Sequence, residues 1–536
     1  EMCIRDSYIP VKSFFTLFLS LFLSSCSDKK IVHSNYIPYE SNIVLSINTA
    51  KIFNTAAFDL IGYNNLFNDL SSGPISSMIL NPADAGLKML SKYHFFLLGS
   101  NLLDVKFGAI LPLSDGDELA DYITKNLQAE IIKSEGFQTA KIPGNHNLVW
   151  DDYTAVYYSG APGGDLMNEA KNIFEQKSEK KLAEIDSTFS SALNSNAHIS
   201  MWIKNNQVAK LIDQGLMLLS DLNVIDLPLM KTNISEQGKT VFLTNFNEGN
   251  ITINQLGYLS SKQTKENNKL VREKKLESLI TETSSENPLI LVNTSLRSDV
   301  LLSILKLLKL DEGLASENVN SSVFPFINQL VEYIDEDVFL VLDSFEDVTR
   351  IKQIPDIDDE GNDVLINKKV IEKIPDLSIA FLVKDSLKFN FMLNILGASL
   401  PKEEEFFNYN NQVYFGVKED LFFITSTKRG VKAISKKEGL LPSDIKSIVQ
   451  NKKSEYYLNI RDILKQSEIL DNYNSLGSGN LINTLFYHKI TSSNGVLRGE
   501  LEINFINQDE NSLLSILKLI SGIASTLKAN HSIGVE

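Results

Sequence analysis

The chain has 536 residues, of which 43% are hydrophobic and 22% are charged, the composition of a globular protein and not of a disordered one. That length allows roughly two to four domains with sizeable cores. A net charge of −16 excludes the basic stripe that neutralises phosphates, so we expect no nucleic-acid partner. The cysteines are Cys3 and Cys26, which excludes a disulfide framework, a thiolate metal site and a cysteine nucleophile in the rest of the chain.

An apolar run near the start of the chain predicts where the protein resides. Phe14–Leu23 is about ten residues long, the length of a signal-peptide core and too short for a membrane-spanning helix. Lys12 supplies a positive flank before the run, and small residues lead to Cys26 after it. The pattern resembles the lipobox of bacterial lipoproteins, in which the cysteine is lipidated and becomes the mature N-terminus.

This resemblance implies how the N-terminal segment is organised. We predict a signal peptide at 1–25, in which 1–7 fits no signal sequence and is interpreted as an artefactual extension, and a lipidated tether at 26–35. A diacylated or triacylated Cys26 buries enough hydrocarbon for stable anchoring. We therefore expect a protein held by its lipid at the bacterial cell envelope, at the outer membrane, on either its periplasmic or its surface face.

Short segments of alternating or apolar residues follow the tether and predict strands, with helices between them. Ser114-Asp115-Gly116-Asp117 carries N-cap residues ahead of one such helix. The predicted strands are 42–48, 94–98, 108–113, 130–133, 137–142, 148–150, 153–158, 198–203, 240–246 and 250–260, and the predicted helices are 51–63, 118–127, 165–174, 187–193 and 207–221. The charged stretch Lys262–Lys275 predicts a boundary, so the first unit is 36–261 and the connector 262–286.

The second unit, 287–536, repeats the pattern of the first. LILVNTS at 289–295 is similar to VLSINTA at 44–50, and the order of elements is the same. The matching pieces are a strand at 337–344, a strand–turn–helix at 377–396, a hairpin at 411–427, a strand at 455–460, and a hairpin of 486–490 with 496–505, before a closing helix at 512–527. We predict an α+β fold of two related halves, each a mostly antiparallel sheet with helices packed on one face.

One acidic stretch is a candidate metal site. Its possible ligands are Asp356, Asp358, Glu360 and Asp363. Alternating carboxylates followed by Gly361 are typical of a calcium loop, but Asn367 stands where such a loop needs a bidentate glutamate. The strand-like flanks 349–354 and 364–370 favour a β-hairpin in which the glycine supplies a positive φ. Calcium is therefore the one cofactor considered, with a hairpin turn as the favoured interpretation.

Other catalytic patterns are absent from the sequence. The six histidines are scattered and form no HExxH pair, and the chain contains neither a GxSxG elbow nor a GxxxxGKS phosphate loop. His94 and His198 open predicted strands, so we interpret them as core-edge residues and not as ligands, and Trp150 and Trp202 lie within strand patterns, so we interpret them as core residues. No catalytic residue is predicted.

The opening strand resembles one family. IPYESNIVLSINTAKIF at Ile37–Phe53 is similar to the start of uncharacterised lipoproteins of Bacteroidota-type bacteria, which follow a lipobox with IP, polar residues and a VVxIN-like strand. The acidic glycine turn at Asp358–Asp363 before the strand Pro375–Val383 is similar too. The resemblance covers Ile37 to about Ile520. That family is a domain of unknown function, so it implies an envelope location and an α+β fold, with no site residues.

We expect a non-enzymatic lipoprotein that binds a macromolecule or scaffolds a complex, with the membrane and other envelope proteins as partners. The cleft between two halves is the expected ligand site. Two alternatives remain open, an envelope hydrolase acting through unidentified carboxylates and a carrier of hydrophobic cargo.

Overall fold

The structure is a computed structural model. It describes residues 32–60, 82–161, 164–211, 238–261, 287–295, 333–357, 363–409, 413–436, 454–466, 482–491 and 496–518, with isolated positions between them. The strands of these segments belong to one sheet of 20 strands, and helices are interspersed among them. The predicted α+β class is confirmed. No helix among the described residues is both long enough and apolar enough to cross a membrane.

The first ten strands pair with one another in residues 43–259, and every pairing is antiparallel. Their order across the sheet is β4-β5-β6-β7-β3-β2-β1-β8-β9-β10. The bounds are β1 (Ile43–Asn48), β2 (Lys92–Leu98), β3 (Lys106–Pro112), β4 (Ile131–Ser134), β5 (Phe137–Ile142), β6 (His146–Trp150), β7 (Thr154–Gly160), β8 (Ile199–Lys204), β9 (Gly238–Phe246) and β10 (Asn250–Leu259).

The next ten strands, in residues 290–505, follow the same antiparallel order, β14-β15-β16-β17-β13-β12-β11-β18-β19-β20. Each pairing of the first ten strands therefore recurs among the second ten. The bounds are β11 (Ile290–Ser295), β12 (Ile334–Ile357), β13 (Asp363–Val383), β14 (Lys402–Glu403), β15 (Phe406–Tyr409), β16 (Val413–Lys418), β17 (Leu421–Thr425), β18 (Ser454–Leu458), β19 (Ile482–Thr491) and β20 (Val496–Phe505).

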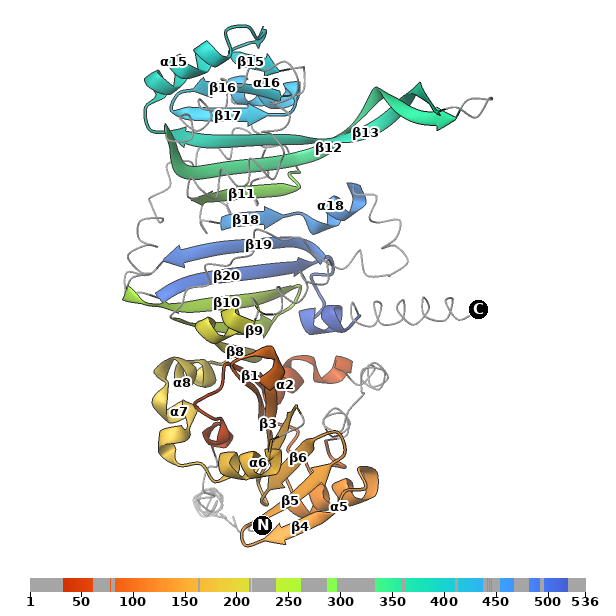
Figure 1. The fold of residues 1–536 in the computed structure, drawn as a ribbon, viewed down its shortest axis with the longest axis vertical. Helices are drawn as coiled ribbons and strands as arrows, with labels where there is room; N and C mark the ends of the chain where they lie inside the picture. Colours follow the sequence, from red (N-terminus) through yellow and green to blue (C-terminus); the bar gives the residue numbers. More distant parts are fainter. Residues whose placement is uncertain are drawn as a thin grey trace, which may run out of the picture.

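The two sets of strands meet edge to edge. β10 pairs with β20 from Asn250 opposite Asn504 to Tyr258 opposite Val496, and the middle pair is Asn254 with Glu500. The sheet therefore runs without a break along the length of the molecule (Figure 1). Where the sequence predicted a ligand cleft between two halves, the structure places a continuous backbone ladder. The connector 262–286 lies outside the described residues.

Aspartates begin several of the helices. The side chains of Asp115 and Asp186 each accept hydrogen bonds from two backbone N–H groups at the start of α5 and α8, and those of Asp165 and Asp385 each accept one at the start of α6 and α15. The helices are α2 (Thr49–Leu60), α5 (Gly116–Asn126), α6 (Leu166–Phe174), α7 (Leu182–Ile185), α8 (Ser187–Asn194), α15 (Ser386–Leu396), α16 (Lys428–Lys436) and α18 (Ile460–Gln466), with the short η1 (His33–Tyr36), η3 (Leu102–Asp104) and η4 (Ser178–Lys180).

The helices cover both faces of the sheet, so the prediction of helices on one face was wrong. Along β3, Ala109 and Leu111 pack in the cluster that contains α5, whereas Ile110 packs in the cluster that contains α6 and α8. Successive strand residues point to opposite faces, so α5 and α6 lie on opposite sides. α15 and α16 divide in the same way between two clusters of the second set of strands.

The end of the predicted tether is part of the folded body. His33 to Tyr36 form η1, in which Ser34 is buried, and His33 Nδ1 lies 3.0 Å from Thr154 Oγ1 of β7. The tether 26–35 is thus shorter than predicted at its C-terminal end. At the other end of the chain, the described part of the predicted closing helix, 512–518, is helical.

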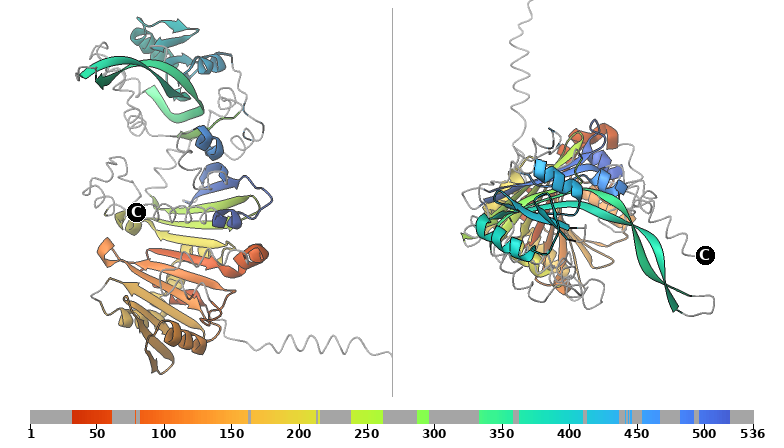
Figure 2. Two further views of the ribbon diagram at one scale, coloured as in Figure 1. Left: turned by 90° about the vertical axis from the view of Figure 1, so that its right-hand side faces the viewer. Right: turned by 90° about the horizontal axis from the view of Figure 1, so that it is seen from above.

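The longest strands form an arm that projects from the body. β12 and β13 pair without interruption from Ser344 opposite Asp376 to Ile357 opposite Asp363. Figure 1 shows this ribbon leaving the body sideways, and the view from above in Figure 2 shows how far it extends. The sequence predicted separate short strands here. The hairpin of 349–354 with 364–370 exists, but as the end of two continuous strands. We call residues Ser344–Ile357 and Asp363–Asp376 the arm.

Candidate functional site

The arm begins at a β-bulge. The pairing of β12 with β13 shifts between Leu342 and Ser344, which leaves Asp343 as an extra residue. A bulge re-aims a side chain and bends the strand. Here the side chain of Asp343, only 9% exposed, accepts a hydrogen bond of 2.9 Å from Nη2 of Arg429 on α16.

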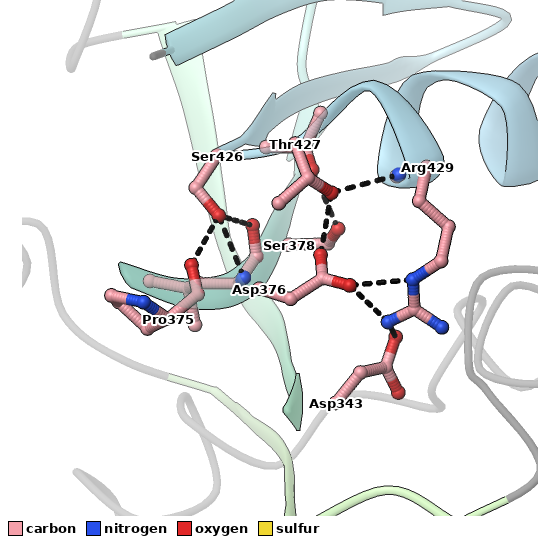
Figure 3. A network of polar contacts seen from close by, with 10 residues as sticks. Asp343, Pro375, Asp376, Ser378, Ser426, Thr427 and Arg429 are labelled. Atoms are coloured by element: carbon pink, nitrogen blue, oxygen red, sulfur yellow. Dashed lines mark hydrogen bonds and ion pairs between the residues drawn. The ribbon is translucent and has the colours of Figure 1, made fainter. Parts of the chain in front are cut away.

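A second carboxylate meets the same guanidinium. Asp376 lies on β13 at the foot of the arm, and its side chain is 1% exposed. Its Oδ2 accepts a hydrogen bond of 2.5 Å from Nε of Arg429, and its Oδ1 accepts one of 2.6 Å from Oγ1 of Thr427 (Figure 3). We call Asp343, Asp376, Thr427 and Arg429 the arm-base cluster. It ties both strands of the arm to the first turn of α16.

The arm-base cluster holds one cation, Arg429, between two largely buried carboxylates. Burial alone would lower the pKa of Arg429, but attraction by Asp376 and Asp343 raises that pKa above its usual value. A buried carboxylate is tolerated only when a cation and hydrogen-bond donors compensate it. Asp376 has both, so the cluster acts as a fixed brace, with its carboxylate fully engaged.

Two small residues let α16 approach closely enough to form this brace. The N–H of Gly430 donates to Thr427 Oγ1 at 3.1 Å, and a Cβ at Gly430 would stand 2.0 Å from Thr425 Oγ1. Ser426 Oγ donates to the carbonyl of Pro375 at 2.6 Å and accepts from the N–H of Leu377 at 2.8 Å. Backbone and hydroxyl groups thus hold β13 and β17 in register beneath the helix (Figure 3).

A similar brace occupies the matching place in the first set of strands, with the charges reversed. Lys106 opens β3, and its Nζ donates to Glu169 of α6 at 3.1 and 3.0 Å. Asp104 lies 3.7 Å away from the same ammonium group. The hydrogen bond to Glu169 raises the pKa of Lys106. No arm follows here, because β2 and β3 are joined by the short segment 99–105.

The arm exposes apolar side chains. Ile351 and Ile371 are each 68% exposed and Leu365 is 65% exposed. The pairing puts Ile351, Thr349 and Pro355 opposite Lys369, Ile371 and Leu365, respectively, so all three exposed apolar residues share one face of the ribbon. A second apolar surface lies on α15, where Leu387, Phe391 and Ile395 are 84%, 68% and 52% exposed at intervals of four residues.

Two of the four predicted metal ligands lie on the paired strands of the arm. Asp356 stands opposite Val364, and Asp363 stands opposite Ile357. Asp358 and Glu360 lie outside the described residues, as does the lipidation candidate Cys26. The described residues contain no group of three or more potential metal ligands. The calcium site and the lipid remain predictions.

The histidines and tryptophans have structural surroundings. His94 Nδ1 lies 2.7 Å from Ser46 Oγ, but both residues are buried within the sheet, so this serine–histidine pair has no access to a substrate. Burial, with smaller effects of His33 and Lys92, lowers the pKa of His94 to about 3. Trp150 donates to the carbonyl of Gly116 at 3.1 Å, and Trp202 donates to Thr188 Oγ1 at 2.9 Å. The interpretation of these aromatic residues as core is confirmed.

Sequence reasoning missed the arm-base cluster. Asp376 and Arg429 are 53 residues apart, and the helix α16 that carries Arg429 was not predicted. One signal was present: a single charged residue, Asp376, opens the otherwise apolar strand LSIAFLV, where a strand of this kind normally carries none. Such a residue needs a partner, but the sequence does not say which one.

Comparisons with known proteins add little to this geometry. No family model matches the chain, and no curated protein matches it. Two crystal forms, I and IV, of a protein named TP0453 are similar at 10% identity and a TM-score of 0.28. The similarity covers 46% of this chain and 89% of TP0453 in form I, and 44% and 85% in form IV. The resemblance to Bacteroidota-type lipoproteins stays a prediction.

Proposed function

We propose that this protein is a lipid-anchored, non-enzymatic binding or scaffold protein of the bacterial cell envelope, and that the arm is its binding element. The observation that carries the proposal is the arm itself, a ribbon that extends from the body with exposed Ile351, Leu365 and Ile371. An isolated two-stranded hairpin is only marginally stable in water. A chain that nevertheless keeps one, and braces it with the arm-base cluster, gains a surface for a partner.

The two buried aspartates among the residues that the structure describes are held in structural contacts. Asp376 is bound by Arg429 and Thr427. Asp186, also buried, caps α8 and forms an ion pair with Lys239. These contacts favour binding over catalysis for the described part of the chain.

We propose in addition that the chain arose by internal duplication. Three features support it: the recurrence of every strand pairing, the aspartate caps of α5 and α15, and the charge-reversed brace. The arm is then an addition to the second half alone. The envelope location is supported by the apolar run and Cys26, and Cys26→Ala is expected to abolish lipid labelling and membrane partition.

The function is tested by removing the arm while keeping its base. Replacing Asp347–Lys373 by Asn-Gly closes the pair Glu346–Ile374 with a favoured two-residue turn, in which Ile374 supplies the N–H that Pro375 lacks. Asp343, Asp376 and Arg429 stay in place, so the body is expected to fold as before. In a pull-down from native envelope, proteins that accompany the parent chain are expected to be lost with the armless variant.

A matched control changes an exposed apolar residue on another element. Leu387→Ser on α15 removes a side chain that is 84% exposed and leaves the arm intact. It is expected to retain the partners of the parent chain. If the armless variant, shown to be folded and lipidated, retains them as well, the arm is not the binding element.

A further inference from the structure

The arm has two open strand edges. In the body, β12 pairs with β11 through Asp337–Leu342, and β13 pairs with β17 through Ser378–Leu382. Beyond those residues, among the strands that the structure describes, β12 and β13 pair only with each other. The backbone groups on the outer edges of the arm are therefore available to another strand.

The two edges differ in how well they can accept such a strand. β12 carries Pro355 near its end, and a proline lacks the N–H that a sheet ladder needs. β13 has no proline between Asp363 and Ile374. The side chains from Leu365 to Lys369 on this strand are all exposed. The outer edge of β13 is therefore the edge better able to accept another strand.

The sequence along this edge is complementary to itself. In an antiparallel pairing of two copies of β13 about a two-fold axis at Ile366, Asp363 stands opposite Lys369 and Ile366 stands opposite Ile366. Opposite charges at facing positions stabilise a strand pair, and like charges destabilise it. An axis at Lys368 would instead place two lysines face to face. An axis at Val370 also faces opposite charges, Lys368 with Glu372, but it would place Asp363 of the second copy opposite Leu377, next to the part of the edge that β17 occupies from Ser378. The register centred on Ile366 therefore pairs opposite charges and also keeps the second arm on the open part of the edge.

Apolar contacts on both faces favour the same register. Leu365 lies diagonally across from Leu365 of the second copy, within reach of a long side chain, on the face that already exposes Ile351 and Ile371. On the other face, Ile366, which is 38% exposed, meets its own copy. An interface in which the same residues face each other across a two-fold axis is the commonest way in which soluble proteins form dimers.

We propose that the partner of the arm is a second copy of this chain, which pairs along the outer edge of β13 to make a four-stranded ribbon from two arms. This inference rests on the proposed function, because it names the occupant of the same binding element. A dimer formed at the arms leaves each body free at the far side, as a scaffold requires.

Exchange of charges tests the register. Asp363→Lys alone puts two basic residues at each facing position, and Lys369→Asp alone puts two acidic ones there. Each single variant is expected to weaken homodimerisation about tenfold or more, because two facing pairs change from attractive to repulsive. An equimolar mixture of the two variants restores opposite charges at both positions and is expected to dimerise like the parent chain. Sedimentation equilibrium of the full chain, against the monomer mass of 60.0 kDa, measures this.

Disulfide trapping tests the axis. Ile366→Cys on the full chain is expected to form a covalent dimer on mild oxidation, since facing residues approach within disulfide range. The parent chain controls for Cys3 and Cys26, and Leu387→Cys controls for random collision at an exposed site. A parent chain that stays monomeric, or single charge variants that dimerise as well as the parent, would overturn the inference. If the armless variant loses envelope partners while the charge variants change nothing, the arm binds a different protein and only the dimer is wrong.

Discussion

We predict that Arg429 contributes more to the free energy of unfolding of the second half than any other partly exposed cation near it. The substitution Arg429→Met keeps much of the apolar stem but removes the Nε–H and Nη donors. Asp376, with 1% of its side chain exposed, would then keep only the hydroxyl of Thr427. A buried carboxylate without its cation is the costly state.

The structure sets the size of the effect. Removing one partner of a fully buried ion pair costs about 3–5 kcal/mol. The side chain of Arg429 is 47% exposed, so water already screens part of the attraction, and we expect a loss of about 2 kcal/mol. Asp376→Asn leaves the half-exposed cation with Asp343 and is expected to cost less, about 1 kcal/mol. The predicted order of destabilisation is therefore Arg429→Met first and Asp376→Asn second.

The assay must report on the second half. Both tryptophans, Trp150 and Trp202, lie in the first half, so tryptophan fluorescence would miss the effect. Amide hydrogen exchange of β13 and α16 reports it directly, and a loss of 2 kcal/mol corresponds to about thirtyfold faster exchange through the opened state. Lys432→Met, at an exposed position on the same helix, is the matched control, and its exchange is expected to equal that of the parent. Equal effects of Arg429→Met and Lys432→Met would refute the account of the brace.

Three further predictions concern other parts of the molecule. Burial lowers the pKa of His94 to about 3, below the value of about 6.5 in an unfolded chain, so the imidazole of His94 is harder to protonate in the folded chain than in the unfolded one. The free energy of unfolding of the first half should fall by up to about 1.4 kcal/mol per pH unit as pH drops from 6.5 toward 3. His94→Gln should reduce this dependence on pH, measured by urea unfolding followed by tryptophan fluorescence. An unchanged dependence would show that other groups cause it. Gly108→Ala should lower stability by about 1–3 kcal/mol, because its Cβ would stand 2.0 Å from Phe96 Cζ; Gly164→Ala, with its nearest atom at 3.5 Å, is the control in thermal unfolding. Leu387→Ser with Phe391→Ser and Ile395→Ser should change stability by less than about 0.5 kcal/mol, yet shorten retention on a hydrophobic matrix, since these side chains are exposed.

The parts of the fold that depend on neighbouring residues could be predicted from the sequence. Asp115 followed by acidic residues predicted the start of α5, and alternation predicted most strands to within a few residues. β14 and β15 were missed, as was α16, whose sequence KRGVKAISK shows only a short apolar stripe around Val431 and Ile434. The periodicity of so short and charged a segment is too weak to identify a helix.

Contacts between distant residues could not be predicted in this way. The residues that pair between β10 and β20 are separated in the sequence by about the length of one half. Nothing in the sequence of either strand indicates which strand it pairs with. The brace is similar, because Asp376 shows that a cation is needed but not that Arg429 supplies it. The sequence predicted separate strands at 337–344, 349–354 and 364–370, whereas the structure joins them into two long strands with a bulge at Asp343.

The two braces explain why an arm can grow from the second half without disturbing its sheet. In each set of strands one cation lies between two carboxylates at the corner from which the arm, or the short segment 99–105, leaves the body: Lys106 between Asp104 and Glu169, and Arg429 between Asp343 and Asp376. The strand supplies the cation in one set of strands and the helix supplies it in the other, so the two braces share one cation between two carboxylates and not a particular residue. Because the corner is held by side chains that point back into the body, the strands beyond it are free to lengthen. The first half ends there with a short turn, and the second half extends into the arm on which its function is proposed to depend.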